Sequence, residues 1–352
     1  MRKIARTTLA TAAALASLAG VASMAHAESS VELYGLVDMG YMNDHDETRG
    51  TGQSIDSGNE SGSRWGIRGV EDLGDGLKAV FQLESGFNGD DGTSAQDDRL
   101  FGRWAYVGLR SDTFGELRLG RQWVLGREWG GEATPFSIAW SRSGLGTTFG
   151  YNDGDFGASG IASNMVMWRS PKFLGGLQGA VGYSYAMDGP EEFGNSNNDR
   201  VLTAGLRYAR GPVRVALTYE HLYADQNRTF GGGKPVQNAT NWQLGGSYDF
   251  EVVRIYAGAG RISDASRGPA RGMDKDYAWT TGVRVPVGAG AFLASWQQTT
   301  NSKVQAWAVG YQYDLSKRTD LYAFLNHSET RDQETGEDAS RRQISVGIRH
   351  RF

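Results

Sequence analysis

Apolar and polar residues alternate with a period of two through most of the chain. The run VQAWAVGYQYDL at 304–315 is representative, and similar runs begin near residues 213, 242 and 279. The bulky face of the first run carries Trp307, Val309, Tyr311, Tyr313 and Leu315. A period of two indicates β-strands whose two faces meet different surroundings.

The connections between these runs alternate between short and long. Short turns such as 210–212 and 286–288 join some runs, whereas polar segments such as 225–240 and 264–275 separate others. This alternation, with aromatic residues near the strand ends, is typical of outer-membrane β-barrels. Strands are predicted to begin near residues 30, 60, 76, 98, 114, 164, 177, 200, 212, 240, 252, 275, 290, 302, 318 and 341. We therefore predict an all-β fold over residues 28–352, a 16-stranded antiparallel transmembrane β-barrel. The runs are too long for a soluble β-sandwich, whose strands typically have about five or six residues.

One long stretch, at about 123–163, lacks sustained alternation. Loops of this length inside a compact domain are usually functional or disordered. Its aromatic content argues against disorder, because it includes Trp129, Phe136, Trp140, Phe149 and Phe156. A barrel of this size encloses a lumen wide enough for water. We expect the loop to fold inward and to narrow that lumen.

The first residues have the pattern of a secretory signal peptide. Basic residues precede an Ala- and Leu-rich stretch from Leu9 to Met24, and Ala25-His26-Ala27 supplies a small-residue cleavage site. The apolar stretch is shorter than the roughly 20 residues of a spanning helix, which argues against a membrane anchor. We expect residues 1–27 to be removed.

Composition excludes several classes of function. Without residues 1–27 the chain is net acidic, which argues against nucleic acid as a partner. Cysteine is absent, so disulfides, thiol chemistry and cysteine-ligated metals are excluded. We expect no cofactor and no metal.

The last residues, 341–352, also alternate and end on an aromatic side chain. One face would meet lipid or a neighbouring subunit, and it carries Ile344, Val346, Ile348 and Phe352. The other face would meet the lumen, and it carries Ser345, Gly347, Arg349 and Arg351. Closing a barrel requires the last strand to pair with the first, near 31–41, so that no edge is left exposed.

Several strings resemble the trimeric Gram-negative porin family over nearly the whole chain after the signal. They are SSVELYGLVDMGY at 29–41, SRWGIRGVEDLGDGLKAVFQLESGF at 63–87, GRWAYVGLRSDTFGELRLGRQ at 102–122, YDLSKRTDLY at 313–322, and the final IRHRF. The resemblance implies an outer-membrane homotrimer whose third extracellular loop enters each lumen. It also implies passive diffusion of small hydrophilic solutes and ions, and a role for Phe352 as a signal to the outer-membrane assembly machinery.

In this family, basic residues of the barrel wall face acidic or polar groups of the inward loop. Arg64 and Arg68 match the family pattern SRxGxRG, while Arg103 and Arg118 match GRxAYVGL and ELRLGR. The resemblance makes these four arginines candidates for the constriction wall. The loop candidates are Glu128, Glu132, Asp153 and Asp155. The alternative is that a wall arginine only pairs with a nearby carboxylate such as Glu84 and stiffens the barrel.

The sign of ion selectivity stays open at this point. Many relatives with a basic constriction carry an arginine three residues before the asparagine that opens the sixth strand, but here Ile161 precedes Asn164. This departure argues against a strong anion preference, and the acidic net charge favours cations.

Two other functions remain as alternatives. An enzyme could use the cluster Asp44-His45-Asp46-Glu47, but such spacing in a polar loop is typical of a solvated turn, and no GxSxG or HExxH motif is present. A substrate-specific anion or sugar channel of the same fold could bind solute through Trp129, Trp140 and Tyr151.

Overall fold

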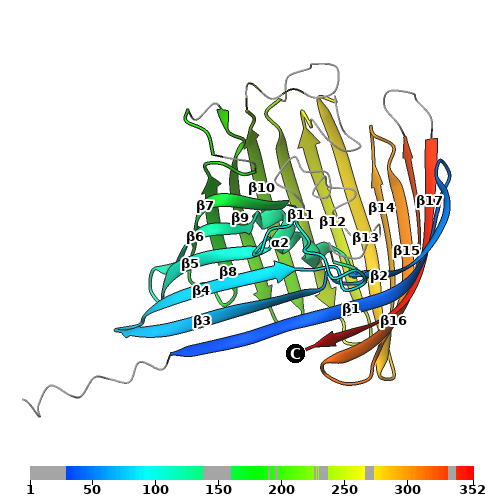
Figure 1. Cartoon of the computed structure of the whole chain (residues 1–352), viewed down its shortest axis with the longest axis horizontal. Coiled ribbons are helices and arrows are strands. Elements are labelled where there is room, and N and C mark those ends of the chain that lie inside the picture. The colour runs from blue at the N-terminus through cyan, green and yellow to red at the C-terminus, as the bar shows by residue number, and fades with distance from the viewer. Residues whose placement is uncertain are drawn as a thin grey trace, which may run out of the picture.

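The computed structural model describes residues 29–137, 160–188, 191–194, 197–225, 227, 229, 237–265, 273–331 and 338–352. Its strands form one antiparallel sheet that closes into a barrel (Figure 1). In chain order the strands are β1 (Ser30–Asp46), β2 (Gly50–Ser57), β3 (Arg64–Gly74), β4 (Leu77–Gly86), β5 (Trp104–Ser111), β6 (Gly115–Trp123), β7 (Ile161–Arg169), β8 (Leu177–Ser184), β9 (Arg200–Arg210), β10 (Val213–Tyr223), β11 (Thr240–Asp249), β12 (Arg254–Ser263), β13 (Lys275–Val287), β14 (Gly290–Thr299), β15 (Gln305–Asp314), β16 (Thr319–Arg331) and β17 (Asp338–Arg351).

Two of these seventeen strands share one place in the barrel wall. The second half of β1 pairs with β2, and its first half pairs with β3. Between β2 and β3 the segment 58–63 leaves the sheet, beginning at Gly58, whose φ of +78° suits glycine. The wall therefore has the predicted sixteen positions, with the second one interrupted.

Most strands begin close to the predicted residues. Apart from β2, which begins at Gly50 and was not predicted, the largest difference is β5, which begins at Trp104 rather than near residue 98. Gln96, Asp97 and Asp98 all adopt left-handed φ values of 56–60°, and three such residues in a row interrupt the extended backbone of a strand. Apolar side chains around this bend hid it from the pattern of alternation.

The two faces of the last strand confirm the predicted orientation. Ile344, Val346 and Ile348 are 42–55% exposed on the outer surface, whereas Ser345 and Arg349 are buried on the inner one. In a membrane, an outer surface of this kind meets lipid.

Closure of the barrel brings the two ends of the chain together. β17 pairs with β1 from Leu36↔Arg351 to Asp46↔Arg341. Beyond this ladder the Phe352 N–H donates to the Gly35 carbonyl at 3.1 Å, and the Gly35 N–H donates to the Phe352 carbonyl at 3.2 Å. The aromatic ring lies over Gly35, where a Cβ would come within 2.4 Å of its Cζ. The predicted pairing of the last and first strands is confirmed.

The described part of the long loop after β6 contains two short helices, α2 (Leu125–Gly130) and the 3-10 helix η1 (Gly131–Ala133). Within the described residues, no helix has the length and apolar character needed to cross a membrane.

Candidate functional site

The segment formed by α2 and η1 lies against the inner wall of the barrel, and Figure 1 shows α2 within the ring of strands. The Leu125 N–H donates to Thr203 Oγ1 at 2.9 Å, and the Gly126 N–H donates to Glu220 Oε1 at 2.8 Å. Thr203 on β9 and Glu220 on β10 are both fully buried. Wall side chains thus satisfy N–H groups at the start of α2 that the helix itself leaves without partners.

Glycines of the wall let this segment approach closely. A Cβ at Gly245 or Gly258 would lie 2.4 Å or 2.8 Å from the Ala133 Cβ. A Cβ at Gly205 would similarly lie 2.8 Å from Trp129, and one at Gly282 would lie 2.6 Å from Pro135, while Phe136 is in van der Waals contact with Gly310. We call these five wall residues the glycine seats. They follow the segment from β9 to β15, so that its path is fixed by direct contact with the wall.

The described loop carboxylates pair with arginines of the wall. Arg169 on β7 donates to both carboxylate oxygens of Glu128, at 2.7 Å to Oε1. Glu132 pairs with Arg207 on β9 and lies 3.9 Å from Arg214 on β10. Burial raises and Arg169 lowers the pKa of Glu128, and the net shift is downward, so this carboxylate stays ionised.

None of these partners is among the four wall arginines predicted from sequence. Asp153 and Asp155 lie outside the described residues.

Two predicted wall arginines come together around Glu84 on β4. The Arg103 Nε donates to Glu84 Oε1 at 2.6 Å, and both side chains are at least nine-tenths buried. The Arg64 Nε lies 3.8 Å from Glu84 Oε2, which also accepts a hydrogen bond from the Tyr34 hydroxyl. Glu84 is therefore the carboxylate partner that the alternative interpretation of these arginines named.

The other two predicted arginines lie elsewhere. Arg68 is half exposed and pairs with Glu32 on β1 at 2.7 Å. Arg118 pairs with Glu116 on its own strand at 2.5 Å, and its guanidinium lies 4.6 Å from the Tyr106 ring centre. Arg64 and Arg103 thus share the carboxylate of Glu84, whereas Arg68 and Arg118 have other carboxylate partners.

A further arginine, on α2, joins Arg64 and Arg103. The guanidinium of Arg127 lies 4.8 Å from the ring centre of Trp123, over which Arg103 also lies at 5.4 Å. Arg127 is only 8% exposed, and within the described part of the chain its Nε has no hydrogen-bond partner. Burial, followed by the charges of Arg103 and Arg64, lowers its pKa to about 9, so it remains charged at neutral pH.

We call Arg64, Arg103 and Arg127 the arginine cluster. Arg127 could not be predicted as a site residue from the family pattern. That pattern places acidic or polar groups on the loop, opposite the basic residues of the wall. The sequence feature that could have indicated Arg127 is its place in LGREWG, where a single arginine stands two residues before a tryptophan.

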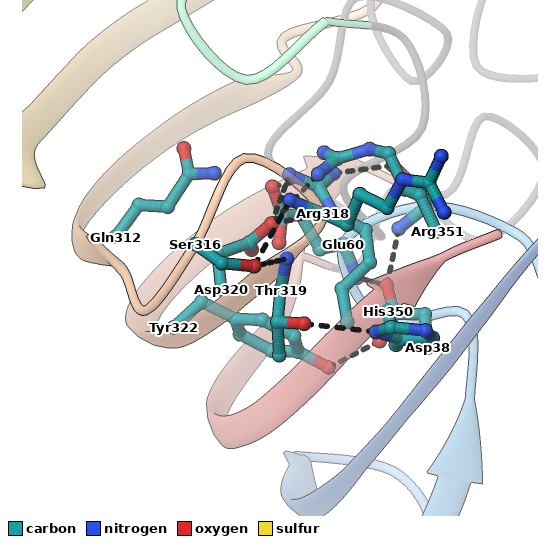
Figure 2. A network of polar contacts seen from close by, with 12 residues as sticks. Asp38, Glu60, Gln312, Ser316, Arg318, Thr319, Asp320, Tyr322, His350 and Arg351 are labelled. Carbon is teal, nitrogen blue, oxygen red and sulfur yellow. Dashed lines mark hydrogen bonds and ion pairs between the residues drawn. The ribbon is translucent and has the colours of Figure 1, made fainter.

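A second polar group lies where the first and last strands meet. Asp38 on β1 holds the segment 58–63, since its Oδ2 accepts the N–H groups of Glu60 at 2.9 Å and Ser61 at 2.6 Å. The Tyr322 hydroxyl donates to Asp38 Oδ1 at 2.6 Å. Figure 2 shows Asp38, Glu60, Asp320 and Tyr322 directed toward one another.

Arg349 on β17 links the carboxylates of this group. It lies 2.7 Å from Glu60 and 3.0 Å from Asp320, with both carboxylates almost fully buried. Burial raises the pKa of Glu60 to about 9, although Arg349 acts in the opposite direction. We call Asp38, Glu60, Asp320 and Arg349 the seam cluster.

The chain is similar to known outer-membrane proteins along almost its full length. A profile of the Gram-negative porin family matches residues 11–333. An outer membrane porin protein of Bordetella pertussis is 36% identical, over 96% of this chain and 98% of the relative. One from Delftia acidovorans is 32% identical, over 96% and 98%. The solved structure of an anion-selective porin from Comamonas acidovorans superposes with a TM-score of 0.76 at 29% identity, covering 92% of this chain and all of that one.

The chain belongs to the Gram-negative porin family. It is an outer-membrane β-barrel that forms a water-filled channel for passive diffusion of small hydrophilic solutes and ions. Long loops of such barrels face the outside of the cell and short turns face the periplasm.

Proposed function

We propose that the arginine cluster forms the basic side of the channel's constriction and gives this general-diffusion porin a preference for anions. The observation that carries the proposal is Arg127, a nearly buried cation with no carboxylate partner among the described residues. Arg64, Arg103 and Arg127 together have Glu84 as their close carboxylate. An excess of positive charge in a narrow passage attracts anions and repels cations.

Neither Ile161 nor the acidic net charge of the chain prevents a preference for anions. Ile161 stands where many relatives place an arginine, but Arg127 supplies a cation from the loop instead. The acidic net charge of the chain acts on the bulk solution, where salt screens it over about 8 Å at physiological ionic strength. The resemblance to an anion-selective porin at 29% identity supports the same sign.

Replacing Arg127 by glutamine should weaken this preference. In planar bilayers under a salt gradient, we expect the anion-to-cation permeability ratio to fall by at least about fivefold. This follows from the loss of about 1 kcal/mol of attraction for an ion passing 4 Å away in water-like surroundings. Arg68→Gln is the matched control, because Arg68 is half exposed and pairs with Glu32. An Arg127→Gln channel with the reversal potential of the wild type would contradict the proposal.

A substrate-specific anion or sugar channel is the second candidate. This candidate is supported by the similarity to a monosaccharide porin from Halomonas, which is 26% identical over 71% of this chain. However, Trp129 packs on Gly205 and is 1% exposed, so it offers no surface to a solute. Trp140 and Tyr151 lie outside the described residues. Conductance that saturates and is blocked by one sugar would favour specificity, whereas linear conductance favours general diffusion.

We also propose that residues 1–27 are a cleaved export signal, which sequencing of the mature N-terminus would test. No catalytic role is proposed, since the acidic cluster after Met42 is engaged in structural contacts. Asp44 pairs with Arg341, Asp46 pairs with Arg49, and His45 hydrogen-bonds Thr51.

We propose further that the channel is a homotrimer and that Phe352 is read by the outer-membrane assembly machinery. Deleting Phe352 removes both backbone hydrogen bonds to Gly35 as well as the ring that covers it. We expect secretion to be retained and the amount of inserted protein to fall severalfold. Unheated SDS gels of outer membranes would measure this, and the same gels should show the wild type as a trimer. Phe352→Tyr, which keeps the ring and the bonds, should insert normally, and equal insertion of the deletion variant would refute the role of Phe352.

A further inference from the structure

A cavity of about 280 Å³ lies near the short-turn end of the barrel, where β8, β9 and β10 meet the turn between β7 and β8. It is separate from the arginine cluster and shares no residue with it. The polar side chains that line the cavity are Lys172, Gln178, Arg207, Arg210 and Arg214.

The charge in this cavity is strongly positive. Four of its side chains are cationic, and Glu132 is the carboxylate that pairs with Arg207 and approaches Arg214. Within the described ranges, Lys172 and Arg210 form no ion pair, and the buried Nε of Arg207 has no hydrogen-bond partner. The neighbouring Asp249 interacts electrostatically with Arg214, but its ion pair is with Arg254. An unbalanced group of cations in a concave site favours an anion.

The backbone is shaped to keep Arg210 at the cavity. Gly175 has a φ of +73°, and a Cβ at this position would lie 2.5 Å from Arg210 Nη1. The glycine therefore leaves the space that the guanidinium occupies. The Gln178 amide donates to the Ser170 carbonyl at 3.1 Å, which ties β8 to the same turn.

We propose that this cavity binds a small doubly charged oxyanion of the phosphate type on the periplasmic side of the channel. Guanidinium groups match phosphate oxygens with paired hydrogen bonds, and a lysine adds a mobile point charge. A water molecule takes about 30 Å³ in the liquid, so the cavity has room for a phosphate group and several waters. Solutes that pass the constriction would pause here before release, and a chloride ion would be held less firmly than phosphate. The inference rests on the proposed anion preference and names the solute class that this preference serves.

The test is block of the chloride current through single channels by inorganic phosphate added on the periplasmic side. The wild type should show a saturable reduction of current. In the double variant Lys172→Gln/Arg210→Gln, the half-blocking concentration should rise by at least about tenfold, because two charge-assisted contacts are lost. Lys317→Gln, which removes a cation from another short turn, is the control and should block like the wild type.

Selectivity in a chloride gradient distinguishes this inference from the proposed constriction. The double variant should keep the wild-type reversal potential, whereas Arg127→Gln should change it while retaining phosphate block. Equal phosphate block in the double variant and the wild type would overturn the site, and so would a wild-type block that never saturates. Should the double variant fail to insert, the same comparison with the single variant Lys172→Gln decides the question. A wild type that prefers cations yet shows saturable block would overturn the constriction proposal alone.

Discussion

Replacing Arg349 by methionine is expected to lower the free energy of unfolding by about 3–5 kcal/mol, the cost of leaving buried charges without their partner. Arg349 is the buried cation that contacts both Glu60 and Asp320, and it also donates to Ser61 Oγ at 2.9 Å. Without it, the buried Asp320 on β16 would keep only the partly exposed Arg351 as a cationic partner, and Glu60 would lose its only ion pair among the described residues. Urea unfolding of the protein in lipid vesicles, followed by tryptophan fluorescence, would measure the loss.

Two further variants test whether the loss in Arg349→Met comes from the buried charge. One removes a partly exposed arginine, and the other changes the carboxyl group of Glu60. Arg351 contacts Asp320 at 3.0 Å, but its side chain is 41% exposed, so Arg351→Met should cost far less. Glu60→Gln should be nearly neutral by itself at pH 7, because a carboxyl with a pKa of about 9 is already protonated there. In the Arg349→Met background, the same glutamine should not worsen the loss. Equal stability of Arg349→Met and Arg351→Met would exclude the seam cluster as a stabilising unit.

Substituting alanine for Gly245 should change the conductance of the channel without opening the barrel. The new Cβ would lie 2.4 Å from the Ala133 Cβ, a distance that real Cβ atoms do not reach, while its next neighbour is 3.4 Å away. The segment containing η1 must therefore move off the wall and into the lumen. We expect the single-channel conductance to fall by at least about a third, as the displaced turn takes space from the water-filled passage.

The clash has a single cause, and this makes a rescue possible. Ala133→Gly removes the opposing methyl group, so the double variant Gly245→Ala/Ala133→Gly should regain the wild-type conductance. Gly52→Ala is the matched control, because nothing lies within 4 Å of a Cβ there. If Gly245→Ala alone conducts like the wild type, the glycine seats do not fix the path of the loop.

The architecture of the barrel could be predicted because the two faces of each strand meet different surroundings. Apolar and polar residues therefore alternate along the sequence of the strand. In β17 the outer residues are branched and apolar and the inner ones small or charged, so the faces of Val346 and Arg349 followed from alternation alone. The interruption between β2 and β3 could not be predicted in this way. It depends on Asp38 of β1, which binds the N–H groups of Glu60 and Ser61 from another part of the chain.

The arrangement of the site was harder to foresee for a related reason. A charged residue in a sequence carries no mark of its partner, and the pairs found here join elements far apart in the chain. Glu128 was a loop candidate opposite the wall arginines Arg64, Arg68, Arg103 and Arg118, but the wall arginine that binds it is Arg169, on the strand that follows the loop. Arg127, its neighbour, turns instead toward Trp123 and Arg103. Adjacent residues of one short helix thus contact different partners, on the neighbouring strands β6 and β7.

The seam cluster also stabilises the closure of the barrel, where the first and last strands meet. Every other strand of the wall is tied to a neighbour by a turn or loop, but the hydrogen bond from Tyr322 to Asp38 spans 284 residues of sequence. Closing a loop of that length costs about 3 kcal/mol more chain entropy than closing a ten-residue hairpin. The buried bonds around Arg349 are of the same order, so buried polar contacts stabilise the joint that chain connectivity leaves weakest.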